Sequence, residues 1–322
     1  MQSDSCFRAG LSTENAEMPS LPTYALISPA RNEAQLIEQT IQAVVAQSVR
    51  PVRWIIVSDG ATDGTDEIVN KYAAQHDWIE LVRMPEREDR SFAGKAVAFN
   101  AGCARLEGLE YDVVGNLDAD ITFDDQYFAF LMDKFAANPQ LGVAGTPYRE
   151  EKMAHDVQFM SPTHVSGACQ MFRRECFEEI GGYRPISSGG IDLIALLSAQ
   201  AKGWQTWRFD ERSCFHHRNV GSGKDAGIFR RLWNRGKKDY LLGSHAGFEI
   251  FRAAYQMKSR PFVIGGVLLL AGYGWSLLTG VERTMPEELI ELRQRDQIER
   301  LKDVVRHPLR RNQERFPATV RS

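Results

Sequence analysis

From Tyr24 onward, short β-rich runs alternate with amphipathic stretches long enough for helices, and this alternation constrains the fold more than any other feature. The β-rich runs are Tyr24–Ser28, Trp54–Val57, Ile79–Arg83 and Val113–Leu117. The pattern is typical of a mostly parallel sheet flanked by helices. The chain has 322 residues and is 43% hydrophobic, so it can fill the core of such a fold. We therefore expect an α/β architecture.

Clusters of polar residues follow three of these runs. Residues 29–33 (Pro-Ala-Arg-Asn-Glu) follow the first run, residues 58–64 (Ser-Asp-Gly-Ala-Thr-Asp-Gly) follow the second, and residues 118–120 (Asp-Ala-Asp) follow the fourth. In open parallel sheets, ligands bind beyond the carboxyl ends of the strands, where loops and helix N-termini supply polar groups. The three clusters together predict a ligand site at that edge of the sheet.

Asp118 and Asp120 are the strongest candidates for metal ligands. Carboxylates spaced in this way at a strand end can hold a Mg²⁺ or Mn²⁺ ion that also binds a diphosphate. They close a Val-Val-Gly-Asn-Leu run, where unpaired carboxylates would be costly. This context favours metal or nucleotide binding over the alternative, which is a pair of solvated turn acids.

Three other polar residues each have a ligand-binding and a structural interpretation. Asp59 could accept hydrogen bonds from a base or a ribose, or it could belong to a turn that leads into a helix. Glu33 could face a ligand or only complement the dipole at the start of a helix. Lys95, which follows Gly94 at an expected helix start, could pair with a phosphate or remain solvated.

Four motifs together resemble family 2 glycosyltransferases, whose GT-A fold is a Rossmann-like, mostly parallel sheet flanked by helices. The motifs lie in order over residues 22–220: Pro29-x-x-Asn32-Glu33, Ser58-Asp59-Gly60-Ala61-Thr62-Asp63-Gly64-Thr65, Gly94-Lys95-x-x-x-x-Asn100-x-Gly102 and Asp118-Ala119-Asp120. The resemblance implies a nucleotide-diphospho-sugar donor, with a UDP-sugar favoured, and a divalent metal, Mn²⁺ or Mg²⁺. The donor-binding residues that it implies are Pro29, Asn32, Glu33, Asp59, Lys95, Asp118 and Arg218.

Within this set, the resemblance implies that Glu33 and Asp59 lie near the nucleoside and Lys95 near ribose or phosphate. The metal would be held by Asp118, Asp120 and a histidine. His216 and His217 follow the strand-like run Trp204–Phe209, as does the histidine that completes the metal site in many GT-A enzymes, and a neutral imidazole can join two carboxylates around a metal. We favour His217 slightly over His216, and the pair could also be a polar surface turn beside Arg218.

Asp192 is the candidate catalytic base. Family members usually carry an acidic pair at the start of the acceptor-side helix, and here Ile191 stands where a glutamate often lies. A carboxylate that takes the proton of a sugar hydroxyl contributes about 10²–10⁴ in rate. Asp192 could instead be only the N-cap of the helix that we expect over residues 191–202. The resemblance implies an inverting, single-displacement transfer with Asp192 as base.

We expect three parts along the chain. Residues 1–22 lack the hydrophobic region of a signal peptide and are expected to be a disordered lead-in. Residues 23–220 would form the GT-A catalytic domain, with a nucleotide-sugar half at 23–125 and an acceptor half at 126–220. Residues 221–322 would form a basic helical extension that ends in an arginine-rich tail.

An apolar segment, residues 262–280, interrupts this extension. It has 19 residues without a charge, and as a helix it would be about 28 Å long against a hydrocarbon core of about 30 Å. Basic residues flank it on both sides, so it could cross a membrane once, re-enter or lie at the interface, or be a buried helix or oligomer face. We expect membrane association at the cytoplasmic face, which makes a polyprenyl-phosphate-linked acceptor plausible beside a glycan.

The sequence therefore predicts a metal-dependent, inverting glycosyltransferase of cell-surface polysaccharide or glycoconjugate synthesis. The net charge of −3 disfavours nucleic-acid binding, and five scattered cysteines disfavour a disulfide framework. Processive synthesis is disfavoured because the chain has Phe-Arg-Arg-Leu-Trp at 229–233 in place of a Gln-x-x-Arg-Trp motif. A sugar nucleotidyltransferase remains as an alternative, although residues 29–33 contain no glycine. A membrane scaffold that binds nucleotide-sugar without turnover also remains.

Overall fold

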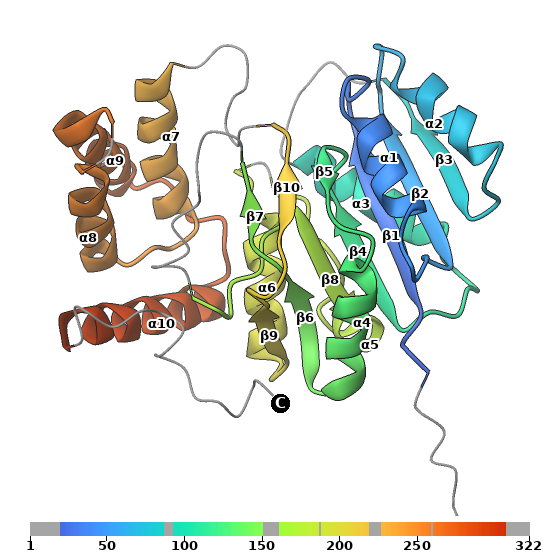
Figure 1. Cartoon of the computed structure of the whole chain (residues 1–322). Coiled ribbons are helices and arrows are strands. Elements are labelled where there is room, and N and C mark those ends of the chain that lie inside the picture. Colours follow the sequence, from blue (N-terminus) through green and yellow to red (C-terminus); the bar gives the residue numbers. More distant parts are fainter. Residues whose placement is uncertain are drawn as a thin grey trace, which may run out of the picture.

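The computed structural model describes residues 20–86, 93–150, 161–186, 188–218, 227–258 and 260–306. Within these ranges, the chain forms a seven-stranded sheet with the order β3-β2-β1-β4-β8-β6-β9 and a small sheet with the order β5-β10-β7 (Figure 1). Residues 1–19 of the expected lead-in and residues 307–322 of the tail lie outside the described residues. The expected α/β architecture, with a mostly parallel sheet flanked by helices, is confirmed.

The first four strands are parallel, and all of them except the edge strand β3 are almost wholly buried. They are β1 (Tyr24–Ala30), β2 (Arg53–Asp59), β3 (Ile79–Met84) and β4 (Val113–Leu117). Because side chains alternate along a strand, Leu26 and Ile56 face one core while Ile27 and Ile55 face the other. The first core lies against α1 (Ile37–Val45), α2 (Thr65–Ala73) and α4 (Tyr127–Ala137), and the second lies against α3 (Ala93–Ala104).

The same sheet continues into the expected acceptor half. β8 (Cys169–Arg173) pairs antiparallel with β4 and with β6 (Leu141–Gly145), and β6 pairs in parallel with β9 (Gln205–Arg208). Two further helices, α5 (Arg174–Glu179) and α6 (Ile191–Ala201), pack on this part. One continuous sheet therefore carries the loops of both expected halves.

A short second sheet places residues beside the end of β4. It contains β5 (Ile121–Thr122), β7 (Tyr148–Arg149) and β10 (Cys214–His216). In its register, His216 lies opposite Ile121, the residue that follows Asp120. This pairing brings the residues around position 216 to the turn that ends β4.

The C-terminal helices stand to one side of the large sheet (Figure 1). α7 (Ile228–Leu241), α8 (Ala246–Gln256) and α9 (Phe262–Leu278) pack together, while α10 (Glu287–Arg306) packs on α6 and α8. The apolar segment thus forms a helix of 17 residues. Among the described residues, no helix has the length and apolar character needed to cross a membrane. α10 lies within the helical extension expected over residues 221–322, although the sequence predicted no separate helix at its position.

Candidate active site

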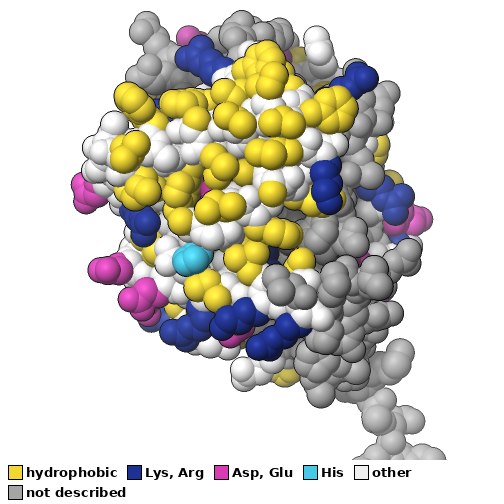
Figure 2. All heavy atoms as spheres, turned by 90° about the vertical axis from the view of Figure 1, so that its left-hand side faces the viewer, with side chains coloured by type: hydrophobic (Ala, Val, Ile, Leu, Met, Phe, Trp, Pro, Cys, Tyr) yellow, Lys and Arg dark blue, Asp and Glu magenta, His cyan; other side chains and the backbone are white. Residues whose placement is uncertain are grey.

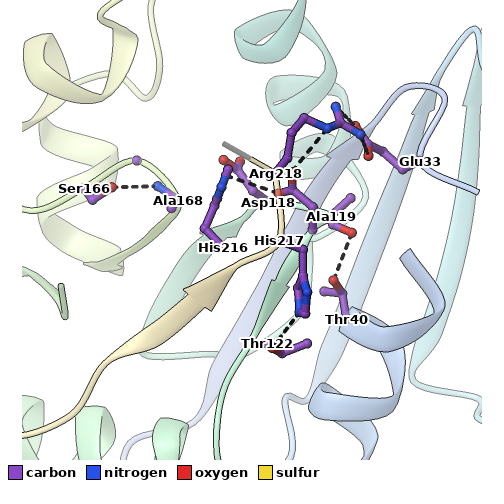
Figure 3. Close-up of polar contacts among 12 residues, drawn as sticks. Glu33, Thr40, Asp118, Ala119, Thr122, Ser166, Ala168, His216, His217 and Arg218 are labelled. Carbon is purple, nitrogen blue, oxygen red and sulfur yellow. Dashed lines mark hydrogen bonds and ion pairs between the residues drawn. The ribbon is translucent and has the colours of Figure 1, made fainter. Parts of the chain in front are cut away.

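Asp118 and Asp120 lie directly after β4 in a turn that is fixed from two sides (Figure 3). The backbone N–H of Asp118 donates to the carbonyl of Ala168 at 2.8 Å, and the hydroxyl of Thr40 on α1 donates to the carbonyl of Ala119 at 2.9 Å. Asp120 is buried, with 6% of its surface exposed. Burial raises the pKa of Asp120, and the nearby Asp118 carboxylate raises it further, while His216, Arg218 and Lys95 oppose the shift.

His216 joins these two carboxylates. One ligand atom from each of Asp118, Asp120 and His216 lies within 4.8 Å of the other two, and His216 Nε2 is 3.5 Å from an Asp120 oxygen. His216 is buried, and among the residues that the structure describes its Nδ1 has no hydrogen-bond partner. Two carboxylate oxygens and one imidazole nitrogen are a donor set that suits Mn²⁺ or Mg²⁺, and the unpartnered buried nitrogen fits a bound ligand. These residues therefore fit a divalent metal.

His217, which the sequence prediction favoured, points away from this cluster (Figure 3). Its Nε2 is 2.9 Å from the hydroxyl of Thr122, and its backbone N–H donates to the carbonyl of Asp120 at 3.0 Å. Successive residues at the end of a strand face opposite sides, so only one of the two histidines can face the carboxylates. The structure gives that place to His216, and His217 holds the turn through Thr122 and its own backbone.

Arg218 connects the cluster of Asp118, Asp120 and His216 to Glu33 in the loop after β1. Its guanidinium forms a two-pronged ion pair with Glu33, with one N–H···O distance of 2.9 Å, and its Nε is 3.8 Å from an Asp120 oxygen. Burial raises the pKa of Glu33 to about 7, although Arg218 opposes this shift; Asp120 and Asp118 add to it. A guanidinium between two carboxylates at a strand end can also bind an incoming phosphate.

Lys95, at the start of α3, forms an ion pair with Asp118. The Lys95 ammonium also donates to the carbonyl of Gly167 at 3.2 Å, and the side-chain amide of Asn116 donates to the same carbonyl at 2.6 Å. The sequence prediction missed Asn116, although an amide in an otherwise apolar strand was a signal for a polar contact. In the structure this amide is fully buried. Lys95 thus lies in the site and joins it to the loop before β8.

The nucleoside side of the expected site is built from the ends of β1 and β2. Asp59 is buried at the end of β2, 3.9 Å from Arg31. Asn32 has a positive φ of 57°, and its side-chain oxygen accepts a hydrogen bond from the backbone of Thr62 at 2.9 Å. Pro29 lies within β1 opposite Val57, so it shapes the strand end. Asp59 and Asn32 are thus brought to the same edge, and Arg31 is a neighbour that the prediction missed.

Asp192 lies in the first turn of α6 and faces Gly167. The N-cap of α6 is Gly190, so Asp192 is not the cap that the sequence left as an alternative. Among the described residues, its carboxylate has no hydrogen-bond or ion-pair partner, while its backbone carbonyl accepts from Gln170. A side-chain carbon placed on Gly167 would lie 2.9 Å from an Asp192 oxygen. The acid therefore packs against the residue whose carbonyl Lys95 and Asn116 hold.

Comparison with known proteins identifies the domain. Residues 25–161 match the family model described as glycosyl transferase family 2. These residues form a family 2 glycosyltransferase domain. The chain is 32% identical over 117 residues to a poly-β-1,6-N-acetyl-D-glucosamine synthase of Staphylococcus epidermidis, and 34% identical over 117 residues to one of Staphylococcus aureus strain COL. Each match covers 36% of this chain and 26% of the relative, so the chain spans about a quarter of the length of these relatives.

Solved structures resemble the glycosyltransferase domain and its extension in fold. A mannosyltransferase of Pyrobaculum calidifontis, solved with GDP-Man and Mn²⁺, superposes with a TM-score of 0.54 at 16% identity, over 90% of this chain and 88% of that one. S. aureus TarS 1–349, solved with UDP-GlcNAc, superposes with a TM-score of 0.51 at 12% identity, over 81% and 74%. At these identities the likeness shows the shared fold, which is GT-A.

Proposed function

We propose that this protein is a metal-dependent, inverting glycosyltransferase that moves a sugar from a nucleotide-diphospho-sugar to a hydroxyl group. The observation that carries the proposal is the cluster of Asp118, Asp120 and His216 at the end of β4 within a family 2 domain. Lys95 and Arg218 border this cluster as cations for a diphosphate. A divalent cation bound there would offset the charge of the departing nucleoside diphosphate.

Asp192 is the base in this proposal. Its carboxylate would take the proton of the acceptor hydroxyl while that oxygen forms a bond to the anomeric carbon of the donor. The bond between the anomeric carbon and the diphosphate oxygen breaks in the same step, and its electron pair leaves with the nucleoside diphosphate. Two observations support this role. Among the described residues the Asp192 carboxylate has no hydrogen-bond or ion-pair partner, and it packs against Gly167, whose carbonyl accepts a hydrogen bond from Lys95.

The donor in this proposal is a UDP-sugar, and the acceptor is a glycan or a polyprenyl-phosphate-linked saccharide. Among the proteins that share the fold, one solved structure holds UDP-GlcNAc and another holds GDP-Man, so the base must be tested directly. The relatives named as poly-β-1,6-N-acetyl-D-glucosamine synthases support a place in cell-surface polysaccharide or glycoconjugate synthesis.

A ligand-binding panel tests the donor site. Thermal unfolding of the full chain is followed with UDP, GDP, UDP-GlcNAc and GDP-Man, each with and without Mn²⁺, because a ligand that binds the folded state raises its apparent stability. We expect a Mn²⁺-dependent rise for one nucleoside, lost in Asp120→Ala and kept in Asp133→Ala, an exposed acid on α4. The absence of a rise with every ligand would overturn the donor-site assignment.

Turnover tests the base. Asp192→Asn should retain the Mn²⁺-dependent donor binding and lose about 10²–10⁴ in transfer or donor hydrolysis. Asp192→Asn with wild-type turnover would rule out Asp192 as the base. Donor binding without turnover in the wild type would favour the scaffold, and pyrophosphate release from a nucleoside triphosphate and a sugar phosphate would favour a nucleotidyltransferase.

A further inference from the structure

On one face of α9, beside the buried Leu269 and Tyr273, glycines lie against the backbones of the neighbouring helices. A side-chain carbon on Gly272 would lie 2.1 Å from the carbonyl oxygen of Trp233 on α7, and one on Gly266 would lie 2.4 Å from that of Ala253 on α8. A side-chain carbon on Gly236 of α7 would likewise lie 2.0 Å from the carbonyl oxygen of Leu269 on α9. Close contacts between helix backbones through glycines are typical of helices in a lipid environment.

The opposite face of α9 is apolar and exposed. We define the α9 face by its large exposed residues Phe262, Val263, Ile264, Val267, Trp275 and Leu278. Their exposed fractions run from 52% at Val267 to 86% at Leu278, and the helix contains no charged residue. Ile250 of α8 and Phe229 of α7 are also large and exposed, at 60% and 52%. Figure 2 shows an extended field of hydrophobic side chains on this side of the molecule.

Basic residues accompany this apolar field. Lys258 and Arg260 are exposed just before α9, and Arg230 and Arg231 are exposed in the first turn of α7. Figure 2 shows Lys and Arg side chains around the edge of the hydrophobic field. A combination of large apolar residues with a basic edge matches a membrane surface that carries anionic lipids.

We propose that the α9 face docks on an anionic lipid surface, with α9 lying in the interface and not crossing the bilayer. A helix of 17 residues is about 26 Å long, and its other face is covered by α7 and α8 along its length, so only one side is available to lipid. A second copy of this chain is a poorer occupant, because symmetric pairing would bring the two basic edges together. The proposal gives the membrane association expected from the sequence a defined surface, and it does not depend on transferase activity.

Flotation of the full chain with vesicles tests the docking. The vesicles are phosphatidylcholine alone or with about one quarter phosphatidylglycerol, a fraction chosen to supply an anionic surface. We expect binding to the mixed vesicles, weakened at least about tenfold by Val263→Glu with Val267→Glu. Val52→Glu, a matched change at an exposed valine before β2, should bind like the wild type. Lys258→Glu with Arg260→Glu should lose about fivefold or more per charge, and only on the anionic vesicles.

Tryptophan fluorescence gives an independent readout of the same surface. Lipids brominated in the acyl chains should quench the wild-type protein and quench Trp275→Phe much less, because Trp275 is the tryptophan on the α9 face. Circular dichroism verifies that each variant is folded. Three results would overturn the proposal: no vesicle binding by the wild type, equal binding by the Val263→Glu, Val267→Glu variant, or a lipid-free dimer in sedimentation that this variant abolishes.

Discussion

In the sheet formed by β1–β4, the largest apolar side chains lie inside, and polar side chains gather at one end of the strands. In the group formed by α7, α8 and α9, glycines bring the helix backbones together around a few large buried side chains such as Leu269 and Tyr273, and many other large apolar side chains face outward. The first region gains stability by filling a core with side chains, whereas the second relies more on contacts between backbones. Apolar composition alone therefore does not predict which face of a helix or strand is buried.

Two phenylalanines should show the largest difference in stability between the sheet region and the helical group. Phe99 of α3 is fully buried against Phe177 and Tyr183, while Phe229 of α7 is 52% exposed. Phe99→Ala should lower the free energy of unfolding by about 3–5 kcal/mol, because it leaves a cavity. Phe229→Ala should change it by less than about 0.5 kcal/mol. Denaturant unfolding of both variants measures the difference, and equal losses would contradict the contrast between the two regions.

Two glycines of α9 test whether backbone contact holds the helical group. Gly272→Ala should destabilise the protein by about 1–3 kcal/mol, because the added methyl group meets the Trp233 carbonyl and forces α7 and α9 apart. Gly274→Ala is the control, since its side-chain carbon would meet nothing within 4 Å, and it should gain up to about 1 kcal/mol from helix propensity. Thermal and denaturant unfolding report both, and a neutral Gly272→Ala would contradict the proposed packing.

The two adjacent histidines test whether the polar end of the sheet is a metal site. His216→Ala should raise the Mn²⁺ concentration for half-maximal stabilisation by UDP at least about tenfold, because loss of even an outer-shell partner commonly costs 10–100-fold. His217→Ala should have a smaller effect, since its ring bonds to Thr122. Titration of the thermal shift with Mn²⁺ measures both constants. A larger effect at His217 would assign the ligand to the other histidine.

A buried acid in α8 should make the stability of the protein depend on pH. Glu249 of α8 is fully buried, and burial together with Asp239 raises its pKa to about 7, against the opposing charges of Arg252 and Arg235. The folded state then holds the proton more tightly than the unfolded state, whose carboxyl titrates near 4.5. Stability should therefore fall as pH rises from about 4.5 to 7 and level off above it.

Glu249→Gln should make this slope shallower, because the amide does not titrate, while Glu33, whose pKa burial also raises to about 7, keeps part of it. Unfolding free energies of the wild type and Glu249→Gln across this pH range provide the measurement. Glu67→Gln, a change at an exposed acid of α2, should leave the slope of the wild type in place. Identical slopes for wild type and Glu249→Gln would show that other groups cause the dependence.

The local pattern of the sequence was enough to predict the strands. β4 occupies the predicted residues Val113–Leu117, and β1 and β2 extend their predicted runs by two and three residues, because buried strands show as short, mostly apolar runs. The bounds of α10 within the expected helical extension were not predicted, because most of its residues are polar or charged and its apolar contacts with α6 involve Leu289, Ile290 and a few neighbours. Such a helix is specified by its partner more than by its own periodicity.

The candidate site was predicted as a set of residues but not as a set of contacts. Asp118, Asp120, Lys95 and Asp192 were predicted from motifs. The choice between His216 and His217 depends on the register of β10 against β5, and the ion pair of Arg218 with Glu33 joins residues 185 positions apart. Register and long-range pairing are set by the whole fold, so a single sequence could not supply them.

Gly167 has a consequence for how this site can change. Its carbonyl is the common anchor of Lys95 and Asn116 on the donor side, and its α-carbon is the surface on which the Asp192 carboxylate rests. In the proposed mechanism, the compartment for the leaving group and the compartment for the attacking hydroxyl would therefore be separated by the backbone of this one residue. Any side chain at position 167 would displace the Asp192 carboxylate and strain the anchor of Lys95, so the two compartments cannot be reshaped independently through this residue.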